Sequence, residues 1–411
     1  MIFEDIKIHE IFDSRGEPTL EVEVFDEKLN SFSAQIPSGK SRGKREATVL
    51  SFKEAEKVLN ELVKKELIHK KFTSIKDLDN FLIGLDGTAN KERIGGNLML
   101  GISIAFARAL AHKENKELWQ ILNEEFWGGL ISAKKPLIFS NLINGGAHAG
   151  NNLDIQEYMV VVNPRTYKIG EGVNSKDQSY TASIKTLIEF YKKLGESLKT
   201  KYKLEKLIIG DEGGYAINFE SNFEPIKIME ELLASKELKK SFSLALDVAA
   251  SNFYKDGKYN FGGNEISSEK LNQILLDYLV HSNLLMSVED PFDEEDFAGF
   301  KEFNAKCPDK WVVGDDLTVT DPELIEKFSK EKMISGVIIK PNQIGTVLES
   351  CQAIRVAQEN DLKTIVSHRS GETEDVFIIH LAKAGNVDAV KIGAPARERL
   401  IKFDELIRLY N

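Results

Sequence analysis

The chain has 411 residues, of which 42% are hydrophobic and 29% charged, a balance typical of an ordinary globular protein with room for a barrel and one smaller domain. Its formal net charge of −11 argues against a general binder of nucleic acid or anionic membranes, since phosphate contacts need clustered lysine and arginine. Two well-separated cysteines, Cys307 and Cys351, fit a reduced cytoplasmic setting and no disulfide or zinc site.

The N-terminal third predicts a small α+β domain. MIFEDIKIHE has no basic start followed by an apolar stretch, so we expect no signal peptide. Residues 1–50 predict a strand, a turn, a second strand with the alternating pattern EPTLEVEVFD, and a loop. Residues 52–111 are helical in pattern, and LMLGISIAFARALAH predicts a buried helix that is too short to cross a membrane.

Small residues and a proline in GGLISAKKP interrupt this periodicity and predict a domain boundary. We therefore expect an N-terminal domain over residues 1–130 and a second domain over residues 131–411. The second domain opens with PLIFSNLINGGAHAGNNLDIQEYMVVV, in which two strand-like pieces flank a loop rich in glycine and asparagine. This spacing predicts a β-hairpin.

Seven short apolar runs between positions 208 and 395 each end on a polar group of a catalytic type. The runs are IIGDEGG, LALDVAAS, SVEDPF, VVGDDL, VIIKPNQ, TIVSHRSG and VKIGAP. They start about 25 to 43 residues apart, which leaves room for one helix each time. This rhythm predicts a β/α barrel, in which the chemistry lies at the carboxyl ends of the strands.

Three successive runs end on the acids Asp247, Glu289 and Asp315. Like charges sharing one cavity need a cation, and an all-oxygen ligand set suits Mg²⁺. The alternative is that each acid caps the helix that follows its strand.

Two lysines and an arginine end further runs. Lys340 follows the apolar run VII, so burial should lower its pKa towards that of a base, unless it only pairs with a nearby acid. Lys391 ends VK in the last run, and Arg369 and Ser370 follow His368 in SHRSG. An arginine beside a hydroxyl can grip a phosphate or carboxylate, although Arg369 could instead pair with Glu372 or Glu374.

The remaining candidates lie in loops. Glu212 precedes a glycine pair, Gln156 and Glu157 lie towards the end of the hairpin piece LDIQEY, and His148 lies in GGAHAG. Read alone, Glu212 could be a solvated loop acid and His148 a surface residue. The stretch Ala34–Ser41, AQIPSGKS, resembles a phosphate-binding loop but lacks its first glycine, and we interpret it as a flexible loop that closes over a substrate.

Together these groups indicate a phosphorylated carboxylate as substrate and metal-assisted elimination of water. A lysine base would remove the proton next to the carboxylate, a divalent metal and Lys391 would stabilise the resulting charge, and Glu212 would protonate the departing hydroxyl.

From DSRGEPTLEVEV to GAPARERL the sequence resembles the enolase (phosphopyruvate hydratase) family. The resemblance rests on LDGTAN, GGAHAG, QEYM, GDEGG, LALDVAAS, VEDPF, GDDLTVT, KPNQIGT, SHRSGETED and GAPARERL, in family order. It implies an α+β domain before an atypical (β/α)₈ barrel that opens with a hairpin. It also implies a cytoplasmic, dimeric or higher-order glycolytic lyase that converts 2-phosphoglycerate to phosphoenolpyruvate.

The resemblance implies a role for each candidate. Lys340 would be the base, and Glu212 the acid, with Glu157 and His148 beside it. Asp247, Glu289 and Asp315 would bind a first Mg²⁺, and Ser41 a second that arrives with substrate. The substrate-binding residues would be Gln156, His368, Arg369, Ser370 and Lys391, with Lys391 on the carboxylate and Arg369 and Ser370 on the phosphate.

The sequence departs from the family pattern in the lid, where SGKSRG replaces SGASTG and a shortened REATVLSFKEA follows. Glu17, Asn252 and GGYAIN also differ from the usual residues. We hypothesise that Lys40 and Arg42 add positive charge near the substrate phosphate. Two other functions stay open: a related enzyme acting on another acidic carboxylate, and a binding protein without catalysis.

Overall fold

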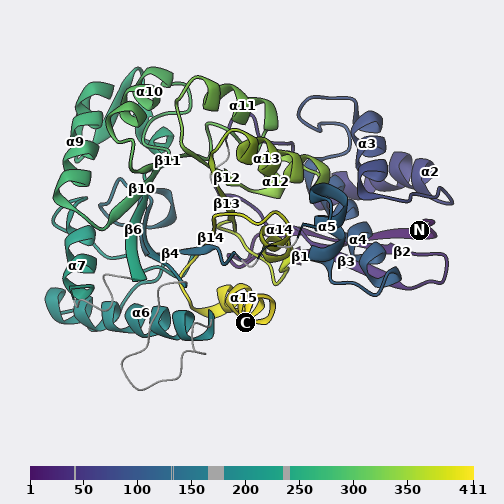
Figure 1. Cartoon of the computed structure of the whole chain (residues 1–411), viewed down its shortest axis with the longest axis horizontal. Helices are drawn as coiled ribbons and strands as arrows, with labels where there is room; N and C mark the ends of the chain where they lie inside the picture. The colour runs from purple at the N-terminus through teal and green to yellow at the C-terminus, as the bar shows by residue number, and fades with distance from the viewer. Residues whose placement is uncertain (41–42, 131, 133, 165–179, 235–240) are drawn as a thin grey trace.

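The computed structural model covers residues 1–411 and describes all of them except 41, 42, 131, 133, 165–179 and 235–240 (Figure 1). The N-terminal elements, purple to blue in Figure 1, lie on one side of a closed barrel built from the later, teal to yellow, part of the chain. Among the helices of the described residues, none is both long and apolar enough to cross a membrane.

An antiparallel sheet of β1 (Asp5–Phe12), β2 (Pro18–Phe25) and β3 (Ser31–Gln35) begins the chain. The first two strands were predicted, whereas β3 falls in the expected loop because its sequence SFSAQ is too polar and short to alternate clearly. The predicted half-buried strand and buried helix are both present, and alternate β2 residues are buried against the apolar helix α4 (Gly96–Lys113). A Cβ atom at Gly101 of α4 would lie 2.2 Å from Val22, so a glycine is needed for this close packing.

The other helices of this region follow the expected helical pattern. They are α1 (Phe52–Val58), which continues through a π-helical turn into α2 (Lys64–Leu67), then α3 (Ile75–Asp86) and α5 (Leu118–Trp127). Ser51 starts α1 through a capping box with Glu54, in which each side chain accepts a backbone N–H of the other residue. A phosphate-binding loop is followed directly by a helix, whereas the described residues 43–51 are not helical and α1 begins only after them.

Eight strands close the barrel in the order β10-β11-β12-β13-β14-β4-β5-β6. Their bounds are β4 (Leu137–Asn144), β5 (Glu157–Val162), β6 (Phe242–Asp247), β10 (Leu285–Glu289), β11 (Trp311–Gly314), β12 (Gly336–Ile339), β13 (Lys363–Ser367) and β14 (Ala389–Ile392). The predicted hairpin supplies β4 and β5, and β5 runs antiparallel to both neighbours. Six of the seven apolar runs form the remaining strands.

The prediction of a strand at IIGDEGG was wrong. Ile209 forms only an isolated bridge to Tyr215, and the hairpin strands already fill the barrel positions that this run would take. Glu212 therefore reaches the barrel from a loop and not from a strand end.

Helices surround the barrel, and a small antiparallel sheet follows β6. The helices are α6 (Tyr180–Tyr202), α7 (Glu224–Leu232), α9 (Ser268–His281), α10 (Phe297–Lys306), α11 (Pro322–Lys330), α12 (Pro341–Ile344), α13 (Val347–Glu359), α14 (Phe377–Ala384) and α15 (Leu400–Tyr410). The small sheet consists of β7 (Tyr254–Lys255), β8 (Lys258–Phe261) and β9 (Asn264–Ile266). The ends of α9, α10 and α11 are capped by Ser267, Asp296 and Asp321, so Asp247, Glu289 and Asp315 are not the caps of these helices.

A buried carboxyl group joins the N-terminal helices to the barrel. Asp79 on α3 accepts hydrogen bonds from the Ser103 hydroxyl at 2.9 Å and from the Leu348 backbone N–H of α13 at 2.8 Å. Burial raises the pKa of Asp79 from 3.8 to about 7.

We expect Asp79 to make stability depend on pH. A raised native pKa means that the folded state binds the proton more tightly, so the free energy of unfolding falls as pH rises from 3.8 towards about 7 and is then level. The slope is at most about 1.4 kcal/mol per pH unit. The Asp79→Asn variant should lose this slope and gain stability relative to wild type at pH 8 more than at pH 5, measured by urea unfolding.

The exposed Asp404→Asn change on α15 is the control, and its pH profile should follow that of wild type. If Asp79→Asn kept the wild-type slope, Asp79 would not be the titrating group.

Candidate active site

The pleat of the barrel strands places the polar residues above an apolar plug. The barrel interior holds a separate apolar cluster, called the plug here, which consists of Phe139, Met159, Val161, Ala245, Val313, Ile338, Ile365 and Ala389. Side chains two residues apart on a strand point to the same side. The polar residues two positions from plug residues are Asn141, Glu157, Asp247, Asp315, Lys340, Ser367 and Lys391. A period-2 pattern thus aims these side chains into one end of the barrel.

The ammonium group of Lys391 lies among three buried carboxylates. Its Nζ donates to Asp247 Oδ2 at 2.9 Å and to both carboxylate oxygens of Glu289 at 2.8 Å, and it lies 3.2 Å from Glu157 Oε2. Strand register explains the grouping, since Asp247 is paired with Glu157 on one side and with Glu289 on the other. Burial lowers the pKa of Lys391, but the three surrounding carboxylates outweigh burial and raise it well above its usual value.

Lys340 donates to Asp315 in a short, buried ion pair. The expectation that its pKa would fall was wrong for this arrangement. Burial does lower the pKa, but the Asp315 charge outweighs burial and leaves the pKa of Lys340 above its usual value. The alternative interpretation of Lys340 as the partner of a nearby acid therefore holds here.

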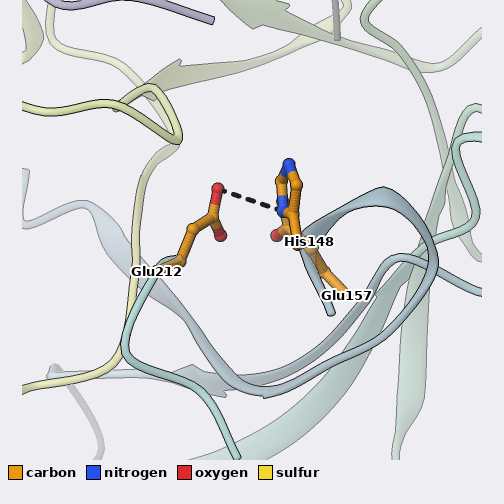
Figure 2. A group of neighbouring side chains, drawn as sticks. All are labelled: His148, Glu157 and Glu212. Atoms are coloured by element: carbon orange, nitrogen blue, oxygen red, sulfur yellow. Dashed lines mark ion pairs between the residues drawn. The ribbon is translucent and has the colours of Figure 1, made fainter. Parts of the chain in front are cut away.

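Figure 2 shows His148, Glu157 and Glu212 converging from three segments. The His148 Nδ1 atom lies 3.4 Å from Glu212 Oε1 and 4.0 Å from Glu157 Oε1, and His368 Nε2 lies 3.7 Å from Glu212 Oε2. All four side chains are buried, so the alternatives of a surface histidine and a solvated loop acid are wrong.

The carboxyl groups of Glu157 and Glu212 have pKa values displaced in opposite directions. Burial, with the Glu212 charge, raises the pKa of Glu157 well above its usual value. Burial also opposes ionisation of Glu212, but His148, His368 and Arg399 outweigh it and hold the pKa of Glu212 below its usual range. Such a split between neighbouring carboxyls separates a proton carrier from an ionised partner, and here it favours Glu157 as the carrier.

The anion-binding candidates lie where the N-terminal region meets the barrel. The guanidinium of Arg369 donates to both carboxylate oxygens of Glu46 at 3.2–3.3 Å, and not to Glu372 or Glu374 as the alternative supposed. Only the Arg369 backbone N–H reaches Glu372. Ser370 Oγ accepts the Lys40 backbone N–H at 2.9 Å, which places the loop around Lys40 over this hydroxyl.

One cavity of about 20 Å³ brings the non-metal candidates together. Its lining includes every residue assigned a catalytic or substrate-binding role: His148, Gln156, Glu157, Glu212, Lys340, His368, Arg369, Ser370 and Lys391. Gln156 is held by the Asn252 amide, which donates to its Oε1 at 3.2 Å. A larger cavity of about 370 Å³ lies beside the β1–β2 turn and meets the first at Gly39, but none of these nine residues lines it.

The donor set fits a divalent cation. Asp247, Glu289 and Asp315 are all nearly fully buried and supply only oxygen ligands. Their charges are met here by the amines of Lys391 and Lys340, and Glu157 Oε2 accepts no hydrogen bond although the Lys391 ammonium lies 3.2 Å away. Among the described residues, the groups whose ligand atoms all lie within 4.8 Å of one another are instead His148, Glu157 and Glu212, and Asp290, Asp315 and Asp316, so this arrangement does not draw the three predicted ligands together. Ser41, predicted as a ligand of a second ion, and Arg42 lie outside the described residues.

Sequence reasoning missed three residues that shape the site. Gln343 could have been found, because it follows Lys340 by one helical turn in KPNQ. Glu46 and Arg399 carry no such signal, since each reaches the site only through the fold. The Arg399 guanidinium is buried and donates to the carbonyl oxygens of Asp211, Arg369 and Ser370, which fixes the loops that carry Glu212 and Arg369.

A closed barrel with buried carboxylates, two lysines and an arginine at one end defines a β/α-barrel enzyme with an acid–base and anion-binding site. Comparison with known proteins narrows this class. The family model described as "Enolase, C-terminal TIM barrel domain" matches residues 133–411, and that described as "Enolase, N-terminal domain" matches residues 3–122.

Individual relatives agree over nearly the full length. The chain is 39% identical to the enolase of Ehrlichia canis, with 98% of this chain and 94% of that protein covered. It is 40% identical to the enolase of Anaplasma phagocytophilum, with 98% and 93% covered, and 38% identical to that of Methanocaldococcus jannaschii, with 98% and 94% covered.

The chain belongs to the enolase family. Membership confirms the predicted fold and the predicted function, an enolase and hence a lyase. It implies a small-molecule substrate and a divalent metal ion.

The lid departure at Lys40 has a testable consequence. Lys40 Nζ donates to Asp211 Oδ2 at 2.9 Å, next to Glu212, and so ties the loop to the barrel rim. We expect Lys40→Ala to raise the KM for 2-phosphoglycerate about two- to fivefold, because a half-exposed ion pair is modest in strength. Steady-state assays at low and high salt should show the difference shrinking as salt screens the charges.

Lys44→Ala is the matched control, since Lys44 lies near the same loop but pairs with Glu294 and Glu295 at 3.4–3.6 Å. Equal changes in KM for both variants would show that Lys40 has no special part in closing the loop.

Proposed function

We propose that this chain catalyses the Mg²⁺-dependent, reversible dehydration of 2-phosphoglycerate to phosphoenolpyruvate in glycolysis and gluconeogenesis. The observation that carries the proposal is the single cavity lined by all nine catalytic and substrate-binding candidates. Their chemistry matches a substrate with one carboxylate and one phosphate, because the lining offers a lysine, an arginine and a hydroxyl as anion partners.

Asp247, Glu289 and Asp315 would hold the first Mg²⁺, which when bound stabilises the second negative charge that develops on the substrate carboxylate. The support is their burial, their all-oxygen donor set and their place around the cavity residues Lys391 and Lys340. Binding of a second Mg²⁺ through Ser41 is proposed from the family resemblance alone.

Lys340 would take the proton from the carbon next to the carboxylate. A base must be uncharged, whereas the Asp315 carboxylate favours the charged form of Lys340. If Asp315 shares its charge with a metal ion, its hold on the Lys340 proton weakens. Lys340, which lines the cavity, is then able to accept a proton from a substrate bound there.

Glu212, with Glu157 and His148 beside it, would pass on the proton that lets the hydroxyl leave as water. Because the pKa of Glu157 is raised and that of Glu212 is lowered, Glu157 would hold this proton first and deliver it through Glu212. Lys391 would bind the substrate carboxylate, Arg369 and Ser370 the phosphate, and Gln156 and His368 would complete the binding surface. Each of these residues is buried and lines the same cavity, which is what orientation of a small substrate requires.

We further propose that residues 1–130 form a capping domain and residues 131–411 the catalytic barrel. The ranges of the two family models, which leave out residues 123–132, support a division there. A cytoplasmic location and a homodimer or higher homo-oligomer, without nucleic-acid or membrane partners, are proposed from the family resemblance.

The activity is tested by following enol phosphate absorbance with 2-phosphoglycerate. Wild type should turn over with Mg²⁺ and stop on addition of EDTA. Lys340→Ala should lower kcat about 10²- to 10⁴-fold, because it removes the base. The control Lys91→Ala breaks another buried lysine–carboxylate pair, with Glu349 at 2.6 Å, and should keep kcat within about threefold. Wild type without turnover would overturn the proposed function.

A further inference from the structure

A chain of hydrogen bonds connects Arg369, the proposed anion-binding arginine, with Asp315, one of the proposed Mg²⁺ ligands. The two residues that link them, Glu46 and Gln343, do not line the candidate cavity. Glu46 accepts from Arg369 at one end. Its Oε1 atom also accepts from Gln343 Nε2 at 3.2 Å, and the same nitrogen donates to Asp315 Oδ1 at 3.0 Å. Asp315 in turn is bonded to Lys340.

Both polar atoms of the Gln343 amide form hydrogen bonds in this network. Its nitrogen donates to two carboxylates, Glu46 and Asp315, and its oxygen accepts the Thr320 hydroxyl at 2.7 Å. Thr320 Oγ1 also accepts the Lys340 backbone N–H at 2.8 Å, so the orientation of the amide is fixed. Gln343 is 1% exposed, and a glutamate there would place a third carboxylate against two others.

Glu46 is equally fixed from the N-terminal side. The next residue, Ala47, donates its backbone N–H to the Gln343 carbonyl at 2.7 Å, so the segment after the lid docks on α12. Gly39 lies so close to the guanidinium that a Cβ atom there would be 1.7 Å from Arg369 Nη2. Arg369 therefore takes its position from the N-terminal segment and not only from its own loop, which follows β13.

We propose that Glu46 and Gln343 are positioning residues that fix Arg369 and Asp315 relative to each other and thereby couple anion binding to metal binding. The inference rests on the proposed function for the roles of Arg369 and Asp315. Neither Glu46 nor Gln343 contacts the reacting atoms, and each acts through the residue it holds.

The substitution Glu46→Gln tests the positioning role of Glu46 most specifically, because it changes the hydrogen-bonding pattern of the side chain and hardly changes its size. Both carboxylate oxygens of Glu46 accept N–H groups, so either orientation of an amide would set its NH₂ against a donor. We expect the affinity for inorganic phosphate to fall about tenfold, since charge-assisted hydrogen bonds of this kind are among the stronger ones. The affinity for Mg²⁺ alone should fall severalfold, although Glu46 touches no Mg²⁺ ligand proposed above.

The substitution Gln343→Leu should weaken Mg²⁺ binding more than phosphate binding, the reverse of the result expected for Glu46→Gln. It leaves the Asp315 and Glu46 carboxylates without their shared donor, so Mg²⁺ affinity should fall about tenfold and phosphate affinity severalfold. Both affinities are measured by isothermal titration calorimetry with inorganic phosphate and with Mg²⁺ as the only probes. If Glu46→Gln does not fold, Glu46→Asp carries the same prediction, because it shortens the reach to both partners.

The control is Glu349→Gln, which breaks the buried Lys91–Glu349 pair between α13 and the N-terminal region, away from the cavity. It should lower the melting temperature and leave both affinities within about twofold. The proposal is overturned if Glu46→Gln and Gln343→Leu behave like this control. It is also overturned if each variant weakens only the probe on its own side, because coupling requires both to change.

The binding measurements need no turnover, so they stand apart from the test of the proposed function. Wild type that binds both probes without dehydrating 2-phosphoglycerate would refute the activity alone. In an active enzyme, Glu46→Gln should raise the KM for 2-phosphoglycerate more than it lowers kcat, whereas a purely structural loss would lower the active fraction and leave KM unchanged.

Discussion

Neutralisation of buried charge is the constraint on which the rest of this structure depends. Four carboxyl groups, those of Glu157, Asp247, Glu289 and Asp315, are buried at one end of the barrel, and the ammonium groups of Lys340 and Lys391 lie among them. Removing charges from water is expensive unless partners are close and well oriented. The strand register supplies that orientation, because it sets Glu157, Asp247 and Glu289 side by side around one lysine.

The same constraint explains why the N-terminal region belongs to the site. Burial opposes the charge of Arg369, and Glu46 from the N-terminal region offsets this cost by pairing with its guanidinium. The bridge between Ser38 and Gly371 and the Lys40–Asp211 ion pair join the two parts along the rim. The cavity is therefore shared between two regions that are far apart in sequence.

Much of this could be predicted from the sequence because catalytic residues at barrel strand ends obey a local rule. Asp247, Asp315, Lys340 and Lys391 each follow a plug residue by two positions, a pattern visible in the residues alone. What depends on distant partners could not be predicted. The strand expected at IIGDEGG gave way to the hairpin, the pKa of Lys340 follows from Asp315, and Glu46 gains its role only when the chain folds back on α12.

A crystal structure of the protein grown with Mg²⁺ would show which groups neutralise the buried carboxylates when the ion is present. We expect one ion bound by Asp247, Glu289 and Asp315, with the Lys391 ammonium no longer between Asp247 and Glu289. An ion bound by Asp290, Asp315 and Asp316, or by His148, Glu157 and Glu212, with Lys391 still bonded to Asp247 and Glu289, would contradict it.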